Sequence, residues 1–147
     1  MFTVPSRIRY ALRALIRLAE RVPSTGPLAL HQIAGEEKIP VKYLESIFTQ
    51  LRRAGIVQSV RGAEGGYLLA RAPEEITILE ILQAVEGPVL TADCLQFPAR
   101  CPQNSCCRTK PVWDELQDDL ETFFRQRTLA TLIAAPRPAG VSAHGGT

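Results

Sequence analysis

Residues 30–69 constrain the fold of this chain more than any other segment, because two helical patterns are followed at once by a hairpin pattern. Apolar residues recur at helical spacing over 30–36 and again over 40–54, with a break between the two segments. Residues 56–60 and 67–70 then have the composition of short strands, and they flank a glycine-rich turn. Two short helices joined by a tight turn and followed by a hairpin predict a winged helix-turn-helix.

The longer of these two helices, which Pro40 opens and Gly55 ends, has an inward and an outward face. The apolar residues predicted to face inward are Val41, Leu44, Ile47, Phe48 and Leu51. The residues predicted to face outward are Lys42, Tyr43, Glu45, Gln50, Arg52 and Arg53. Because the second helix of a helix-turn-helix enters the major groove, we expect DNA contacts from Lys42, Tyr43, Glu45 and Arg52.

The turn of the predicted hairpin gives three further candidates for DNA binding. Gly65 and Gly66 have no side chains, which would let the backbone approach a phosphate closely. Arg61 would enter a minor groove, where the negative potential is enhanced. The alternative is that both glycines only satisfy a turn that needs positive φ.

Charge is distributed unevenly along the chain. Residues 1–70 hold ten Lys and Arg against five Asp and Glu, whereas residues 71–147 hold seven against ten. Five of the basic residues are arginines of an amphipathic helix predicted over 6–21. This polarity suits an N-terminal half that meets phosphate. The alternative for the helix is a face of arginines that contacts only solvent.

Two further helices are predicted in the second half. Residues 77–80 have the pattern of a capping box and begin a helix that ends at Gly87. From residue 110 or 111 to 127, apolar residues recur at intervals of three and four, as in a coiled-coil stripe. We expect this helix to pair with the same helix of a second chain. The alternative is that it packs on its own domain. One more short helical turn is expected over 128–133, at the edge of the dimer.

The chain is therefore expected to be mainly α-helical and to divide into four parts. These are a winged helix-turn-helix domain with a two-stranded wing over 1–88, a cysteine-rich loop over 89–109, a dimerisation helix region over 110–133 and a tail over 134–147. The tail is rich in proline and glycine and is predicted to be disordered.

All four cysteines lie between Asp93 and Trp113, in a proline-rich segment without helical periodicity that predicts an irregular loop. The start of the chain lacks the features of a signal peptide, and no apolar run approaches the ~18 residues of a membrane span. We therefore expect a cytoplasmic protein without a membrane partner. In that reducing compartment, clustered cysteines bind a metal or respond to redox state more often than they form disulfides.

Cys94, Cys101 and Cys107 have the spacing C-x6-C-x5-C, and Cys106 directly precedes the last of them. Zinc is a second choice, because zinc sites commonly use two C-x2–4-C pairs and this chain has no such arrangement. Three thiolates on one flexible loop suit an iron–sulfur cluster, whose irons favour soft sulfur ligands. Adjacent cysteines do not easily reach one small cluster together, so only one of Cys106 and Cys107 is expected to bind it. The other is a bystander or a redox-active thiol.

Several motifs occur together in this order. They are Arg9-Tyr-Ala11, Tyr43-Leu-Glu45, Leu51-Arg-Arg-Ala-Gly-Ile-Val57, Val60-Arg-Gly-Ala-Glu-Gly-Gly-Tyr-Leu-Leu69, the three spaced cysteines and Trp113. With these motifs, residues 6–113 resemble the Rrf2 family of bacterial transcription regulators. The resemblance covers about three-quarters of the chain.

This resemblance implies a homodimer of two winged helices with crossed dimerisation helices, and an iron–sulfur cluster held between the cysteine loop of one chain and the other chain. The residues that match the family's cluster ligands are Cys94, Cys101 and Cys107. This match leaves Cys106 as the candidate redox thiol. Those that match its recognition helix and wing arginine are Tyr43, Glu45 and Arg61.

The fourth ligand of such a cluster is not evident. Where some members have a histidine three residues after the last cysteine, this chain has Lys110. Where others have an acidic residue near the start of the first helix, it has Arg7 and Arg9. A three-cysteine [4Fe–4S] cluster with one labile iron fits this pattern best, and a [2Fe–2S] cluster is the second choice.

We therefore expect a homodimeric regulator that binds double-stranded operator DNA and senses redox, iron or nitric oxide status through an iron–sulfur cluster. The alternative is a cluster-free thiol switch in which Cys106 or Cys107 is oxidised. The sequence has no C-x-x-C motif, nucleophile–base pair or phosphate-binding loop. Neither enzymatic activity nor a small-molecule substrate is therefore expected.

Overall fold

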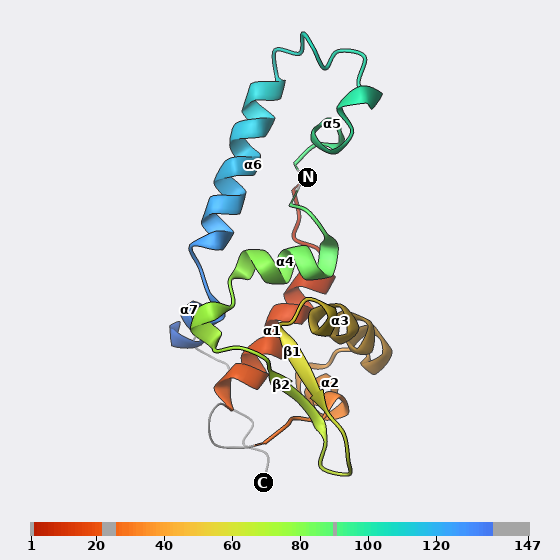
Figure 1. The fold of residues 1–147 in the computed structure, drawn as a ribbon, viewed down its shortest axis with the longest axis vertical. Coiled ribbons are helices and arrows are strands. Elements are labelled where there is room, and N and C mark those ends of the chain that lie inside the picture. The colour runs from red at the N-terminus through yellow and green to blue at the C-terminus, as the bar shows by residue number, and fades with distance from the viewer. Residues whose placement is uncertain (1, 22–25, 90, 137–147) are drawn as a thin grey trace.

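The computed structural model describes residues 2–21, 26–89 and 91–136, which form helices and one two-stranded antiparallel sheet (Figure 1). The first elements are α1 (Ser6–Glu20), α2 (Leu30–Glu37), α3 (Val41–Arg53), β1 (Val57–Val60) and β2 (Gly66–Leu69). They are followed by the 3₁₀ helix η1 (Pro73–Glu75), α4 (Ile78–Glu86), α5 (Asp93–Gln96), the 3₁₀ helix η2 (Pro98–Arg100), α6 (Lys110–Arg125) and α7 (Leu129–Ala134). This order confirms the predicted mainly helical winged helix-turn-helix with a two-stranded wing.

Local backbone signals fix the ends of α2 and α3. Helix α2 ends at Lys38, whose φ of +55° lies in the left-handed region and turns the chain toward α3. At the other end of α3, Gly55 has a φ of +74°. Its N–H donates to Arg52 O at 3.0 Å, and the N–H of Ile56 donates to Leu51 O at 3.0 Å. These two bonds form a Schellman motif, so the prediction that Gly55 ends the helix is confirmed.

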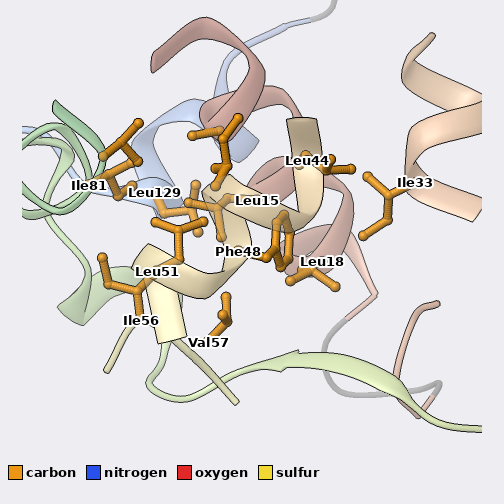
Figure 2. Close-up of a cluster of buried hydrophobic side chains, with 14 of the residues drawn as sticks. Leu15, Leu18, Ile33, Leu44, Phe48, Leu51, Ile56, Val57, Ile81 and Leu129 are labelled. Carbon is orange, nitrogen blue, oxygen red and sulfur yellow. The ribbon is translucent and has the colours of Figure 1, made fainter. Parts of the chain in front are cut away.

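The core lies where α1, α3 and α4 pack together, and Figure 2 shows their apolar side chains gathered around Phe48. Leu15 of α1, Phe48 of α3 and Ile81 of α4 are each 0% exposed. Helix α4 begins with a capping box in which Thr77 and Glu80 bond to each other's backbone N–H, as the sequence predicts. The core therefore combines residues of α1, α3 and α4. We call the described residues within 2–89 and 126–136 the winged module.

Helix α7 belongs to this core. The short helical turn predicted over 128–133 is present as α7, and Leu129 is 0% exposed within the core cluster. The N–H of Ile78 donates to Arg127 O at 2.9 Å, and the N–H of Leu129 donates to Ile76 O at 2.9 Å. These bonds fasten the C-terminal end of the described chain beside the start of α4.

Between α4 and α7 the chain leaves the core and returns, and Figure 1 shows α6 and the segment before it projecting away from the winged module. We call residues 91–125 the arm. The prediction of an irregular cysteine loop is wrong at α5 and η2, which are helical turns too short to show periodicity in sequence. Helix α6 begins at Lys110 as predicted and ends at Arg125, two residues earlier than the apolar pattern indicates.

One prediction about the inward face of α3 is wrong. Leu44, Ile47, Phe48 and Leu51 are each 0% exposed, but Val41 is 40% exposed. Val41 is the first residue of the helix and follows the exposed Pro40, so it lies at the exposed end of the buried face.

None of the helices found in 2–21, 26–89 and 91–136 is long and apolar enough to cross a membrane. The predicted disordered tail begins at Ala134, which the structure places at the end of α7. Residues 137–147 of that tail lie outside the described residues.

Candidate DNA-binding surface and cysteine arm

Three of the four residues of α3 predicted to contact DNA are exposed: Lys42, Glu45 and Arg52. The helix carries them on the side away from Leu44 and Ile47, which are buried. Thr49 lies on the same side and donates its hydroxyl to Glu45 O at 2.9 Å, one turn earlier in the helix. With Arg53, which is also exposed, the helix thus presents three cations and one carboxylate to solvent along its length.

Tyr43, the fourth candidate, is placed differently. The prediction that it faces outward is wrong in part, because it is half-buried and packs against the core cluster. Its ring meets that of Tyr10 edge-on at 5.6 Å between centroids, and the guanidinium of Arg7 lies 5.4 Å from its centroid. Arg7 also donates to Ser46 at 3.3 Å and to Gln50. Tyr43 therefore helps to hold α3 against α1.

The arginines of α1 have partners within the winged module. Arg13 lies 2.9 Å from a carboxylate oxygen of Glu37, and Arg17 lies 2.6 Å from the other. Burial opposes ionisation of Glu37, but hydrogen bonds from Arg17 and Arg13 outweigh it and lower the pKa of this carboxyl group. These arginines join α1 to the end of α2. The basic side of α1 is therefore in part a structural feature, which the sequence pattern does not indicate.

The wing places Arg61 on an exposed turn between β1 and β2. A Cβ added to Gly65 would overlap the carbonyl oxygen of Val60, and one added to Gly66 would overlap that of Leu28. Leu28 lies so close because its backbone pairs with that of Tyr67 through bonds of 3.0 and 2.9 Å. Both glycines thus have a structural role, whereas a contact of either with DNA stays a prediction.

The arm holds all four cysteines as free thiols. Cys94, Cys101 and Cys107 are partly exposed, and Cys106 is exposed with its thiol 3.5 Å from the side-chain oxygen of Gln103. Within the described ranges, no three Cys, His, Asp or Glu side chains are gathered closely enough to hold a metal ion. The three predicted ligands are therefore not assembled in the single chain, and their role as ligands stays a prediction.

Cys107 and Lys110 lie at the start of α6. A hydrogen bond with the hydroxyl of Thr109, at 3.1 Å, and the backbone N–H groups of Thr109 and Lys110 lower the pKa of the Cys107 thiol. A bond of 2.9 Å to Asp114 raises the pKa of Lys110, and the nearby Cys94 and Cys107 add to that effect. Free, partly exposed thiols, of which Cys107 has a lowered pKa, are suitable in chemistry for an iron–sulfur cluster. The ammonium group at the position expected for a fourth ligand offers no lone pair.

An apolar groove with a volume of about 680 Å³ lies beside the arm. It is formed by residues 2–5 before α1, the end of α4 and one face of α6, where Leu116 and Phe124 line it. Phe2 is 81% exposed and Val4 56% exposed at its edge. The sequence patterns of the helices do not indicate this groove, although the apolar residues Phe2 and Val4 before α1 are a usable signal.

Comparison with known proteins places these features in a family. Residues 4–135 match the family model described as "Rrf2: Iron-dependent Transcriptional regulator". The rrf2-like HTH-type transcriptional regulator of Rhodobacter capsulatus is 34% identical over 143 residues, which cover 92% of this chain and 95% of that protein. The HTH-type transcriptional regulator IscR of an Enterobacter species is 37% identical over 128 residues, which cover 87% of this chain and 77% of that protein.

A solved structure supports the same relationship. CymR, the global cysteine regulator of B. subtilis, superposes with a TM-score of 0.75 and 31% sequence identity. The superposition covers 93% of this chain and all of CymR. The likeness therefore extends over the winged module and the arm together.

Proposed function

The chain belongs to the Rrf2 family of transcriptional regulators, and on that premise we propose that it binds operator DNA as a homodimer and senses redox, iron or nitric oxide status through an iron–sulfur cluster. The observation that carries the proposal is the combination of a winged helix with three free, partly exposed cysteines on one projecting arm. In this proposal residues 1–88 bind DNA, residues 89–109 hold the cluster and residues 110–133 contain the dimerisation helix.

The proposed DNA contacts come from α3 and the wing. Lys42, Glu45 and Arg52 are exposed on α3, and Arg61 is exposed on the wing. Lys and Arg neutralise phosphates and release counterions, so affinity for DNA should fall steeply with salt concentration. Glu45 suits the exocyclic amino group of a cytosine in the major groove. Tyr43 also helps to hold α3 against α1, and its exposed part is a further proposed DNA contact. Gly65 and Gly66 allow the wing to lie close to the DNA backbone.

The proposed dimer uses α6. All 16 residues of this helix are described, and none of them is buried in the single chain. Its apolar residues and the adjacent groove would be covered by the same surfaces of a second copy, as a two-fold interface requires. The dimer would then set the separation of the two recognition helices, which must match about one turn of DNA, roughly 34 Å.

The proposed cluster ligands are Cys94, Cys101 and Cys107, with a [4Fe–4S] cluster preferred over [2Fe–2S]. When bound, such a cluster supplies a redox-active centre whose potential depends on its ligands and its exposure. Assembly would draw the three cysteines together and so reshape the segment from α5 to the start of α6. Since α6 is also the proposed dimer helix, the presence or oxidation state of the cluster would alter the placement of the two winged modules.

Anaerobic purification tests the cluster directly. The wild-type protein should be brown and contain iron and sulfide, and Cys101→Ala should lose most of both. Cys106→Ala is the matched control and should keep them, because Cys106 is not a proposed ligand. If Cys101→Ala retained a full cluster, the ligand assignment would be wrong.

A cluster-free thiol switch is the second candidate function. Two observations favour it: Cys106 is exposed, and the pKa of the neighbouring Cys107 thiol is lowered by its hydrogen bond with Thr109 and by backbone N–H groups. A colourless protein whose DNA binding responds to an oxidant, and stops responding in Cys106→Ala, would support the switch in place of the cluster.

A further inference from the structure

Val41 is an apolar residue that α3 leaves in solvent. It is 40% exposed, whereas the four other apolar residues that the helix pattern assigns to the same face are 0% exposed. A single exposed valine is ordinary on a protein surface and needs no function. The position of Val41 on α3, however, indicates a function.

Val41 is the first residue of α3, and it follows the exposed Pro40. The N-terminal residues of a recognition helix are those that contact base edges in the major groove. Glu45 and Arg52 follow Val41 by four and eleven residues, and a period of 3.6 residues places all three along one line of the helix. All three side chains are exposed. Val41 thus lies at the leading end of the row that carries the proposed base contacts.

The chemistry of the major groove offers one apolar target for such a residue. The C5-methyl group of thymine is the apolar feature that distinguishes base pairs there, and apolar side chains contact it. The exposed charges around Val41 suit the rest of that groove: Lys42 and Arg52 suit phosphates or guanine, and Glu45 suits cytosine. An apolar protein partner would instead have to desolvate these three charged groups.

We propose that Val41 packs against the C5-methyl group of a thymine in each operator half-site, and so helps to determine which sequence the protein binds. This inference rests on the proposed DNA-binding function. Lys42, Glu45 and Arg52 are proposed to make polar contacts with DNA. Val41 would add an apolar contact that also determines specificity. The thymine should lie next to the base pairs that Glu45 contacts, because the two side chains are one helical turn apart.

The test begins with the full-length wild-type protein, purified anaerobically, and a random library of DNA duplexes. Sequences that bind are selected, and each thymine of the selected site is then replaced by deoxyuridine, which lacks only the methyl group. Affinities for both duplexes are measured by fluorescence anisotropy at one salt concentration. For wild type, one thymine position in each half-site should lose about fourfold in affinity when replaced, the effect of one buried methyl group.

Val41→Ala should bind the thymine site more weakly than wild type and should show no further loss on the uracil site. Alanine is a good helix former, so this variant should fold. Val60→Ala is the matched control, because Val60 is a valine of β1 that is 38% exposed. It should keep the fourfold difference between thymine and uracil.

The outcomes separate the two proposals. If no sequence is enriched from the library, the DNA-binding function fails and this inference fails with it. If a specific site is found but no thymine-to-deoxyuridine replacement in it lowers affinity, the DNA-binding function stands and the proposed contact of Val41 with a thymine methyl group does not exist. Equal losses for wild type and Val41→Ala at every thymine would also overturn the inference.

Discussion

Helices α3 and α6 are both long amphipathic helices, yet the structure uses their apolar faces in opposite ways. Helix α3 buries four apolar residues completely, with Phe48 at 0% exposed. Helix α6 buries none of its 16 residues, and Phe123 is 48% exposed. The same periodicity therefore completes a core in one helix and leaves a partly exposed apolar face in the other. The winged module therefore has a buried apolar core within one chain, whereas helix α6 of the arm has no buried residue.

The largest effect should come from the buried aromatic ring of α3. We expect Phe48→Ala to lower the free energy of unfolding by about 3–5 kcal/mol, because it leaves a cavity in the core. Phe123→Ala in the arm is the matched control, and it should cost less than about 1 kcal/mol within the single chain, as surface positions usually do. Urea unfolding of both variants, at a protein concentration low enough that the chain is monomeric, measures this. Equal costs would remove the distinction between the two helices.

Association should be affected most by α6. We expect Leu120→Asp to weaken the dimer by roughly 2–4 kcal/mol, because a carboxylate would enter the apolar groove that Leu120 lines. Sedimentation velocity at micromolar concentration should show monomers, and operator affinity should fall with them. Thr122→Asp, an exposed position on another side of the helix, should remain dimeric. A dimeric Leu120→Asp would show that α6 is not the interface.

A smaller loss of stability is expected from a change in the wing, where the backbone at Gly66 lies close to that of Leu28. We expect Gly66→Ala to cost about 1–3 kcal/mol, because the added methyl group would overlap the carbonyl of Leu28 and force the pairing apart. Gly35→Ala is the control, since nothing lies within 4 Å of an added Cβ there. It should stabilise α2 by about 0.5–1 kcal/mol. Thermal unfolding at one pH compares the two, and a neutral Gly66→Ala would mean that the wing moves freely.

The smallest effect concerns the ion pairs between α1 and α2. Because the folded pKa of Glu37 is below its ordinary value of 4.5, its contribution to stability is fully present above that pH and is lost as the pH falls through the folded pKa. Glu37→Gln should therefore be less stable than wild type by about 1 kcal/mol or less at neutral pH, and the gap should close on acidification. Urea unfolding from pH 7 to pH 3 measures the gap. Glu64→Gln, on the exposed turn of the wing, is the control and should be as stable as wild type at neutral pH, as exposed surface positions usually are.

Much of the winged module was predictable from sequence because its signals are local. Gly55 and the Thr77 capping box mark helix ends through bonds within a few residues, and both are confirmed. The signals failed where a side chain's surroundings come from another element. Periodicity places Val41 on the buried face, but Val41 lies at the first position of α3 and is exposed. Tyr43 has the pattern of an outward residue, yet it packs on α1.

The arm was less predictable for the same physical reason. Turns as short as α5 contain too few residues for a period to appear. Sequence spacing shows which cysteines could act together, but it does not show where their sulfur atoms lie in space. The position of Lys110 near Cys94 and Cys107, and the stabilised Cys107 thiolate, appear only when the start of α6 is placed beside the loop.

The attachment of α7 has a consequence for the order in which the molecule can fold during synthesis. Leu129 fills part of the core, and its N–H bonds to Ile76 across the whole length of the arm. A chain emerging from the ribosome therefore lacks one core residue until the entire arm has been translated. Until then the winged module would expose an apolar gap, so it should reach full stability only after the arm has been made.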